Sequence, residues 1–145
     1  MSNNVREHTV HATTTNTFGR VLLNARQHHF VIDGPVQNQC PGEALTPAES
    51  FLAGVAACGV ELVQVIAKED GVAIGDVKLT IYGKVDRDNP VRPDLTVFNQ
   101  VKITIRVADT PREAAEALVQ KFTRRCPLYG TVAAACPDVS VEVAG

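Results

Sequence analysis

The sequence predicts an α+β fold whose elements follow the order βββ-α-ββ-αα-β. Runs of alternating or β-branched residues lie next to one another along the chain, and two Thr-Pro-x-Glu sequences mark helix starts. Short connections between neighbouring strands favour antiparallel pairing over a doubly wound sheet. The 145 residues suit one domain, residues 1–145, with no repeat or linker.

Three strands are predicted in the N-terminal third. Residues 8–16 alternate and are rich in threonine, and Arg20–Ala25 and His28–Asp33 follow after short turns at residues 18–19 and 26–27. Residues 34–45 contain two prolines and two glycines, which predicts a loop.

The longest predicted helix begins at the capping box Thr46-Pro47-Ala48-Glu49. Thr46 and Glu49 can each satisfy the other's backbone amide, and proline suits the first helical position. We expect this helix to end near Asp70, with Gly71 as its stop. Glu61 and Gln64 interrupt its apolar stretch, which favours a buried helix over a membrane span.

The second half of the chain is expected to contain strands at residues 77–87 and 96–108, joined by a loop. A second capping box at residues 110–113 predicts a helix to about Thr123. Cys126-Pro127 resembles another helix start, with the cysteine at the N-cap and proline at N1. The chain then closes with a strand at Val139–Val143.

Composition excludes several classes of function. A net charge of −2 and the absence of tryptophan argue against binding to nucleic acid or an anionic membrane. The N-terminus has no apolar signal-peptide core, so we expect a reducing cytoplasm. In that compartment cysteines are more often catalytic, metal-binding or inert than structural disulfides.

Metal and nucleotide cofactors are not expected. Histidines occur as two pairs, but the members of each pair point to opposite faces of their strands; they are His8, His11, His28 and His29. Metal-ligand spacings and a glycine-rich phosphate loop are both absent from the sequence.

Cys126 is a candidate redox residue because a helix N-terminus favours a thiolate and lowers the thiol pKa. Arg124 and Arg125 precede it and could strengthen that effect. Cys58 lies in the longest helix among small residues, where a cysteine is often an ordinary core residue. Together, an attacking thiolate and a second thiol in reach could support a sulfenic acid and disulfide cycle.

At these residues the chain resembles the OsmC/Ohr family of osmotically induced and organic-hydroperoxide-resistance proteins. The resemblance rests on the Pro-x-Glu helix that carries Cys58, on the Cys126-Pro127 helix start, and on the threonine-rich strand that ends at Arg20. It implies an intertwined homodimer around long central helices, with Cys58 peroxidatic, Cys126 resolving, and Arg20 paired with the Cys58 thiolate. An arginine suits this role because it is always charged and offers several donors.

The resemblance also implies organic hydroperoxide substrates and a dithiol reductant, in some members a dihydrolipoyl group. In its organic-hydroperoxide branch a catalytic glutamate lies ten residues before the helix cysteine, where this chain has Ala48. Glu49 lies nine before it, about half a turn around a straight helix from Cys58, and is expected to be a cap or a helper in the neighbouring subunit's site.

Three further residues are given lesser roles. Glu61 lies next to Cys58 on the helix surface and could raise its thiol pKa, or it could equally be a buried polar residue or a dimer contact. Cys40 lies in a loop and could be a third redox thiol, but is expected to be incidental. Cys136 could compete as the resolving thiol, but it lies at a helix end, where the helix dipole disfavours a thiolate.

The sequence thus predicts a thiol-dependent peroxidase, a cysteine-based enzyme in which Cys58 attacks the hydroperoxide, Cys126 resolves, Arg20 supports the thiolate and Glu49 helps. The alternative is a non-enzymatic dimer that binds a small ligand or partner and uses its cysteines as a redox sensor. Ala48 stands where the organic-hydroperoxide branch has its catalytic glutamate, and this difference keeps the alternative open.

Overall fold

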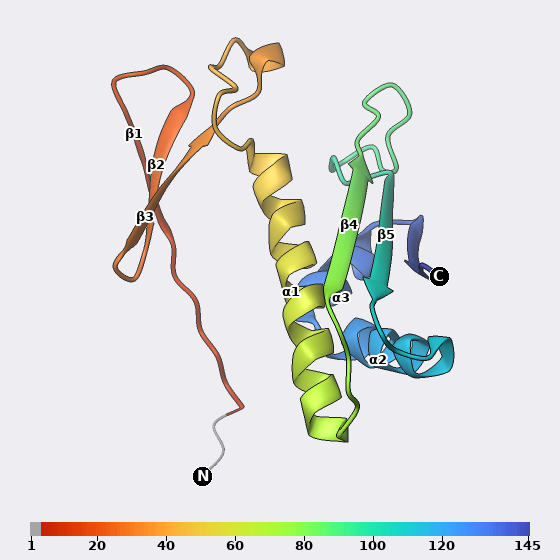
Figure 1. Ribbon diagram of the computed structural model, residues 1–145. Helices are drawn as coiled ribbons and strands as arrows, with labels where there is room; N and C mark the ends of the chain where they lie inside the picture. Colours follow the sequence, from red (N-terminus) through yellow and green to blue (C-terminus); the bar gives the residue numbers. More distant parts are fainter. Residues whose placement is uncertain (1–3) are drawn as a thin grey trace. The chain divides into compact units, whose positions relative to one another are not determined.

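The computed structural model describes residues 4–145 and has the predicted order of elements (Figure 1). The α+β fold class is therefore confirmed. The elements are β1 (His11–Thr14), β2 (Arg20–Ala25), β3 (His28–Asp33), the 3-10 turn η1 (Val36–Asn38), α1 (Pro47–Asp70), β4 (Val77–Lys84), β5 (Gln100–Val107), α2 (Arg112–Arg125), α3 (Pro127–Ala135) and β6 (Val139–Val143). The chain forms two compact units, residues 1–51 and 52–145, and each is described by itself.

The first unit is an antiparallel sheet in the order β1-β2-β3. β1 is shorter than the predicted strand at residues 8–16 because the chain turns after Thr14. The Thr15 hydroxyl donates to the backbone oxygens of Thr17 and Arg20, and its oxygen accepts from the Thr17 amide. β2 and β3 have the predicted bounds, and their register sets Arg20 directly opposite Asp33.

The loop after β3 lies against the ends of β2 and β3. The Cys40 side chain packs on Gly19 and Gly34, which flank Arg20 and Asp33 in the sequence. A Cβ at either glycine would lie 2.3 Å or 2.5 Å from the Cys40 sulfur, so only glycine fits at both positions. Gly34 also donates to the Gly19 carbonyl at 2.8 Å, which closes the end of the hairpin.

The second unit contains the sheet β4-β5-β6. β4 and β5 pair antiparallel, as expected for strands that follow one another, and both are shorter than the predicted strands at residues 77–87 and 96–108. β6 pairs parallel to β5, with Ile103 opposite Val141. This direction follows from its connection, because α2 and α3 carry the chain back across the sheet before β6 begins.

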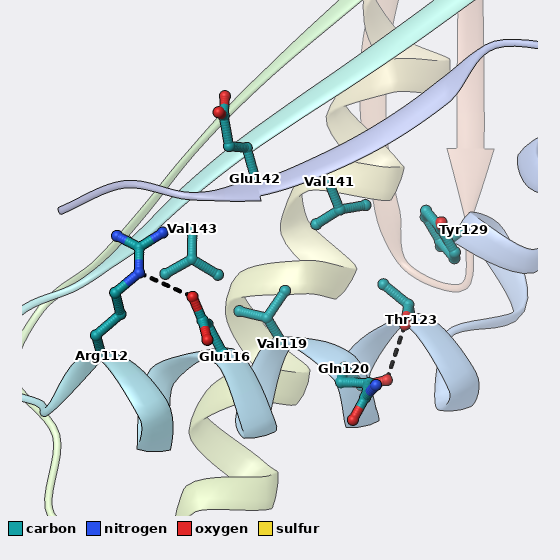
Figure 2. Close-up of a pocket in the computed structure, with 9 residues that line it drawn as sticks. All are labelled: Arg112, Glu116, Val119, Gln120, Thr123, Tyr129, Val141, Glu142 and Val143. Carbon is teal, nitrogen blue, oxygen red and sulfur yellow. Dashed lines mark hydrogen bonds and ion pairs between the residues drawn. The ribbon is translucent and has the colours of Figure 1, made fainter.

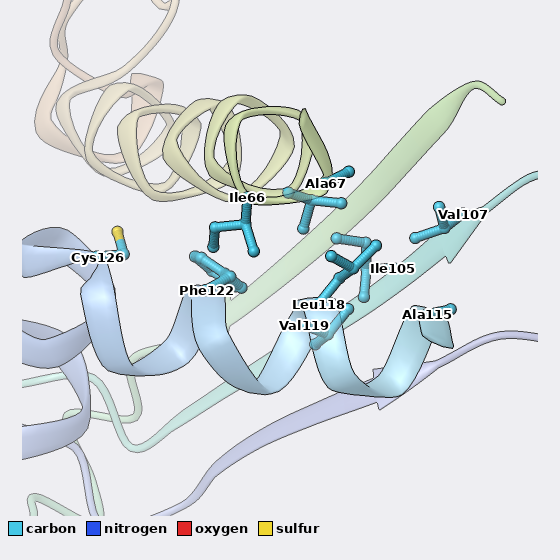
Figure 3. Close-up of a cluster of buried hydrophobic side chains, with 10 residues drawn as sticks. Ile66, Ala67, Ile105, Val107, Ala115, Leu118, Val119, Phe122 and Cys126 are labelled. Carbon is cyan, nitrogen blue, oxygen red and sulfur yellow. The ribbon is translucent and has the colours of Figure 1, made fainter. Parts of the chain in front are cut away.

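The core of the second unit lies between α1, α2 and the inner face of this sheet (Figure 3). Ile66 and Ala67 of α1 meet Phe122 and Leu118 of α2 and Ile105 of β5, and all five are at most 2% exposed. A second cluster surrounds Val55, Val101, Ile103, Val132 and Cys136. Inward residues alternate with exposed ones along β4 and β5, as in a sheet with one face in solvent.

α1 is long and apolar enough to cross a membrane by length and composition, a test that the core helices of soluble proteins also pass. Its buried residues share one side of the helix and pack in the two clusters of the second unit, which is how a core helix behaves. They are Val55, Gly59, Val63, Ile66 and Ala67. The helix ends at Asp70, with Gly71 in a left-handed conformation (φ 68°), as predicted.

The second predicted capping box is wrong. α2 begins at Arg112, one residue later than the box requires, so Pro111 occupies the N-cap position. Thr110 therefore lies outside the helix, and its hydroxyl donates to the Ala108 carbonyl at 2.8 Å. α2 also continues past the predicted end at Thr123 to Arg125.

Candidate active site

Cys126 lies at the junction between α2 and α3. As predicted, it is the N-cap of α3, with Pro127 at N1, and its sulfur accepts a hydrogen bond from the Tyr129 amide at 3.3 Å. The residue is 2% exposed and belongs to the core cluster that contains Phe122. An amide donor at a helix start favours negative charge on that sulfur.

Cys58 is placed by the close approach of α1 to α2 and β4. The next residue, Gly59, is buried, and a Cβ there would lie 2.6 Å from Leu79 and 3.2 Å from Phe122. The absence of a side chain thus lets the helix lie directly on these residues. Cys58 is partly buried and packs against the cluster that contains Cys126.

The two thiols are free and interact with each other. Burial above all, together with hydrogen bonding to Cys126 and the negative charges of Cys126 and Glu61, raises the pKa of the Cys58 thiol to about 12. Glu61 therefore acts on Cys58 as predicted. The fold thus places two thiols that are far apart in the sequence in the same core cluster.

Within the part of the chain that the structure describes, the charges that act on Cys58 are all negative. Arg125, which could support Cys126, pairs its guanidinium with Glu69 of α1 at 2.6 Å. Arg124 is exposed.

Arg20 belongs to the first unit, where it is held by carboxylates. Its Nε and Nη2 donate to the two oxygens of Asp33 at 2.8 Å and 2.9 Å, and Nη2 also donates to Glu43 at 3.3 Å. These interactions raise the pKa of Arg20 and hold the pKa of Asp33 well below its usual range. The sequence analysis did not find Asp33, although pairing residues 20–25 with 28–33 around a two-residue turn sets it opposite Arg20.

Glu49 forms the predicted capping box. Its carboxylate accepts from the Thr46 amide at 3.1 Å and from the Thr46 hydroxyl at 2.8 Å, and its own amide donates to that hydroxyl at 3.3 Å. Hydrogen bonding to Thr46 lowers the pKa of Glu49. The cap is thus formed, while a catalytic role of Glu49 stays a prediction.

The other cysteines lie elsewhere. Cys136 is the C-cap of α3, and its thiol donates to the Asp138 carbonyl at 3.6 Å in the second core cluster. Cys40 packs on the two glycines in the first unit. Among residues 4–145, no group of three or more His, Cys, Asp or Glu side chains could hold a metal ion.

A cavity of about 510 Å³ lies between α2, α3 and β6 (Figure 2). Its floor is apolar, with Val119, Val141 and Tyr129, and the ion pair of Arg112 with Glu116 lies at one end. Neither sulfur of the cysteine pair lines it.

Comparison with protein families decides the relationship. The family model described as OsmC-like protein matches residues 40–142, a span that contains both Cys58 and Cys126. The chain belongs to the OsmC-like family. A comparison with curated proteins gave no match.

Solved OsmC-family structures share the fold. An OsmC-like protein from Mycoplasma pneumoniae superposes with a TM-score of 0.82 at 15% identity, over 96% of each chain. An organic hydroperoxide resistance protein OsmC from Legionella pneumophila, also described as a predicted redox protein, gives 0.75 at 20% identity over 99% of this chain and 100% of that one. The organic hydroperoxide resistance protein OhrB of Bacillus subtilis gives 0.65 at 20% identity, over 96% and 98%.

Proposed function

We propose that this OsmC-like protein is a thiol peroxidase that reduces organic hydroperoxides through Cys58 and Cys126. The observation that carries the proposal is the interaction of the two free thiols, one on α1 and one at the start of α3. The names of the Legionella and Bacillus relatives, both organic hydroperoxide resistance proteins, favour this substrate class.

The reaction has three steps. The Cys58 thiolate attacks the O–O bond of the hydroperoxide, which takes up a proton and leaves as an alcohol, while Cys58 becomes a sulfenic acid. The Cys126 thiol then attacks the sulfenic sulfur, so that water leaves and a disulfide forms. A dithiol reductant, such as a dihydrolipoyl group, returns both cysteines to thiols and is itself oxidised to a disulfide.

Arg20 is the cation that we propose for the Cys58 thiolate. The proposal answers a specific need, because burial and neighbouring negative charge raise the pKa of Cys58 to about 12 and would leave it protonated at neutral pH. A nearby guanidinium opposes both effects. The proposal also includes a homodimer, in which Glu49 assists at the site.

The test is turnover of an organic hydroperoxide with dihydrolipoic acid as the reductant. Cys58→Ser should abolish turnover, whereas Cys136→Ser and Cys40→Ser, as matched controls, should keep it. Full turnover in Cys58→Ser would refute the proposal. Non-reducing mass spectrometry after one equivalent of hydroperoxide should find Cys58 linked to Cys126.

A redox sensor is the second candidate function, and it is favoured by the partly buried position of Cys58 beside Glu61, which raises the pKa of the thiol. A protonated thiol reacts slowly with peroxides, because the thiolate is the nucleophile. One slow, stoichiometric oxidation of wild-type protein, without turnover at excess reductant, would support the sensor over the enzyme.

A further inference from the structure

Asp33 is unusual among the described residues 4–145. It is the charged side chain with no exposed surface, in a unit whose other residues are mostly exposed. Burying a carboxylate is costly unless every oxygen is compensated by donors. A buried carboxylate at this place therefore needs an explanation.

Four donors surround the Asp33 carboxylate. Two come from the Arg20 guanidinium at 2.8 Å and 2.9 Å, and two are the amides of Glu43 at 3.0 Å and Ala44 at 2.9 Å. The Asp33 amide also donates to the Leu45 carbonyl at 3.0 Å. Asp33 thus ties Arg20 to the segment that leads directly into α1.

This arrangement fixes the orientation of the Arg20 guanidinium. Nε and Nη2 are occupied, and Nη1 has no hydrogen-bond or ion-pair partner within residues 4–145. The Arg20 side chain is 30% exposed, so this free edge can be reached. Because the guanidinium is planar, two-point pairing on one edge sets the direction in which Nη1 points.

Glu43 contributes much less to this arrangement. Its carboxylate shares Nη2 with Asp33 at a longer distance of 3.3 Å, and its side chain is 78% exposed. Exposed ion pairs of this kind contribute little. Glu43 is therefore the natural control for Asp33.

We propose that Asp33 is a positioning residue: it holds the Arg20 guanidinium in one orientation and leaves the Nη1 edge free to donate in the proposed reaction. The inference rests on the proposed role of Arg20 in the peroxidase reaction. Asp33 offsets part of the Arg20 charge, so removing Asp33 would leave that charge stronger while the guanidinium loses its fixed orientation. Removing Asp33 should therefore slow the reaction of the thiolate without raising the pKa of Cys58.

The experiment measures the second-order rate of Cys58 oxidation by cumene hydroperoxide from pH 5 to 10, which gives a plateau rate and a thiol pKa. In Asp33→Asn the plateau should fall roughly ten- to a hundredfold, because small misplacements of catalytic groups cost about that much. The pKa of Cys58 should stay the same or fall. Glu43→Gln should keep the plateau within about twofold.

A double variant separates positioning from general stability. In an Arg20→Ala background, Asp33→Asn should have no further effect on the plateau rate, because its target is gone. An equal loss in both backgrounds would mean that Asp33 does not act through Arg20, and would overturn the inference. A lowered plateau rate in Arg20→Ala together with a wild-type plateau rate in Asp33→Asn would also overturn the inference. That result would leave the proposed function intact.

Arg20→Lys provides the same test if Asp33→Asn fails to fold. Lysine keeps the charge but cannot be held at two points, so its plateau should fall as in Asp33→Asn. A wild-type plateau in Arg20→Lys would show that orientation is unimportant and would overturn the inference. Arg20→Ala at the wild-type rate would instead refute the proposed role of Arg20 itself.

Discussion

The Cys126 sulfur accepts a hydrogen bond from the Tyr129 backbone amide at 3.3 Å. One side chain thus caps α3 and also interacts with the Cys58 thiol. The same sulfur thus has a capping role and the proposed resolving role, and substitutions can separate the two.

Serine and alanine at position 126 should behave differently. Cys126→Ser keeps an N-cap acceptor, so stability should be maintained, whereas Cys126→Ala should lose about 1 kcal/mol of unfolding free energy. Both variants should lose the disulfide with Cys58. Urea unfolding and non-reducing mass spectrometry measure the two properties, and equal stability of the two variants would contradict the capping role.

Gly59 should not tolerate a methyl group. Its added Cβ would lie 2.6 Å from Leu79 and 3.2 Å from Phe122, so Gly59→Ala should destabilise the protein by about 1–3 kcal/mol despite the better helix propensity of alanine. Gly130 in α3 is the matched control, because nothing lies within 4 Å of its added Cβ. Gly130→Ala should be neutral or stabilising by up to about 1 kcal/mol in thermal unfolding.

The pH dependence of Cys58 alkylation should show whether Arg20 lowers the pKa of the Cys58 thiol, as proposed. In Arg20→Ala the pH midpoint of Cys58 reaction with iodoacetamide should rise toward 12, the value set by burial, Cys126 and Glu61. In the wild-type protein the pH midpoint of this reaction should be lower. Peptide mapping of the label distinguishes Cys58 from the other thiols, and identical midpoints in both proteins would remove Arg20 from the site.

Acid should weaken the first unit through Asp33. The folded-state pKa of Asp33 is lowered, so its contribution to stability is present above the ordinary value of 3.8 and is lost as the pH falls below it. Chemical shifts of β2 and β3 should follow this loss as the pH is lowered below 3.8. Asp33→Asn should flatten the response, and an unchanged acid transition in that variant would contradict the assignment.

Local signals predicted most of the secondary structure. The capping box at Thr46, Gly71 as a helix stop and the Cys126-Pro127 start each depend on a few neighbouring residues, and all three occur. The capping box predicted at Thr110 does not form, because the helix starts one residue later than expected. The four residues of the box do not by themselves indicate that later start.

The site could be predicted only in part. The contact of the two thiols depends on how closely α1 packs on Phe122 and Leu79 at Gly59, which is a tertiary property without a sequence pattern of its own. The Arg20–Asp33 pair, in contrast, follows from the hairpin register and was open to prediction. The burial of Asp33 was not, because it depends on the loop at Glu43 and Ala44 folding back over the strand ends.

The packing of Cys40 against Gly19 and Gly34 has a practical consequence for chemical labelling of this protein. The Cys40 sulfur fills the space that side chains at residues 19 and 34 would occupy. A bulky tag on that atom must push apart the turns on either side of Arg20 and Asp33. Labelling of all thiols would therefore disturb Arg20, the residue whose effect on Cys58 the labelling is meant to measure. The remaining cysteines should be labelled in a Cys40→Ser background.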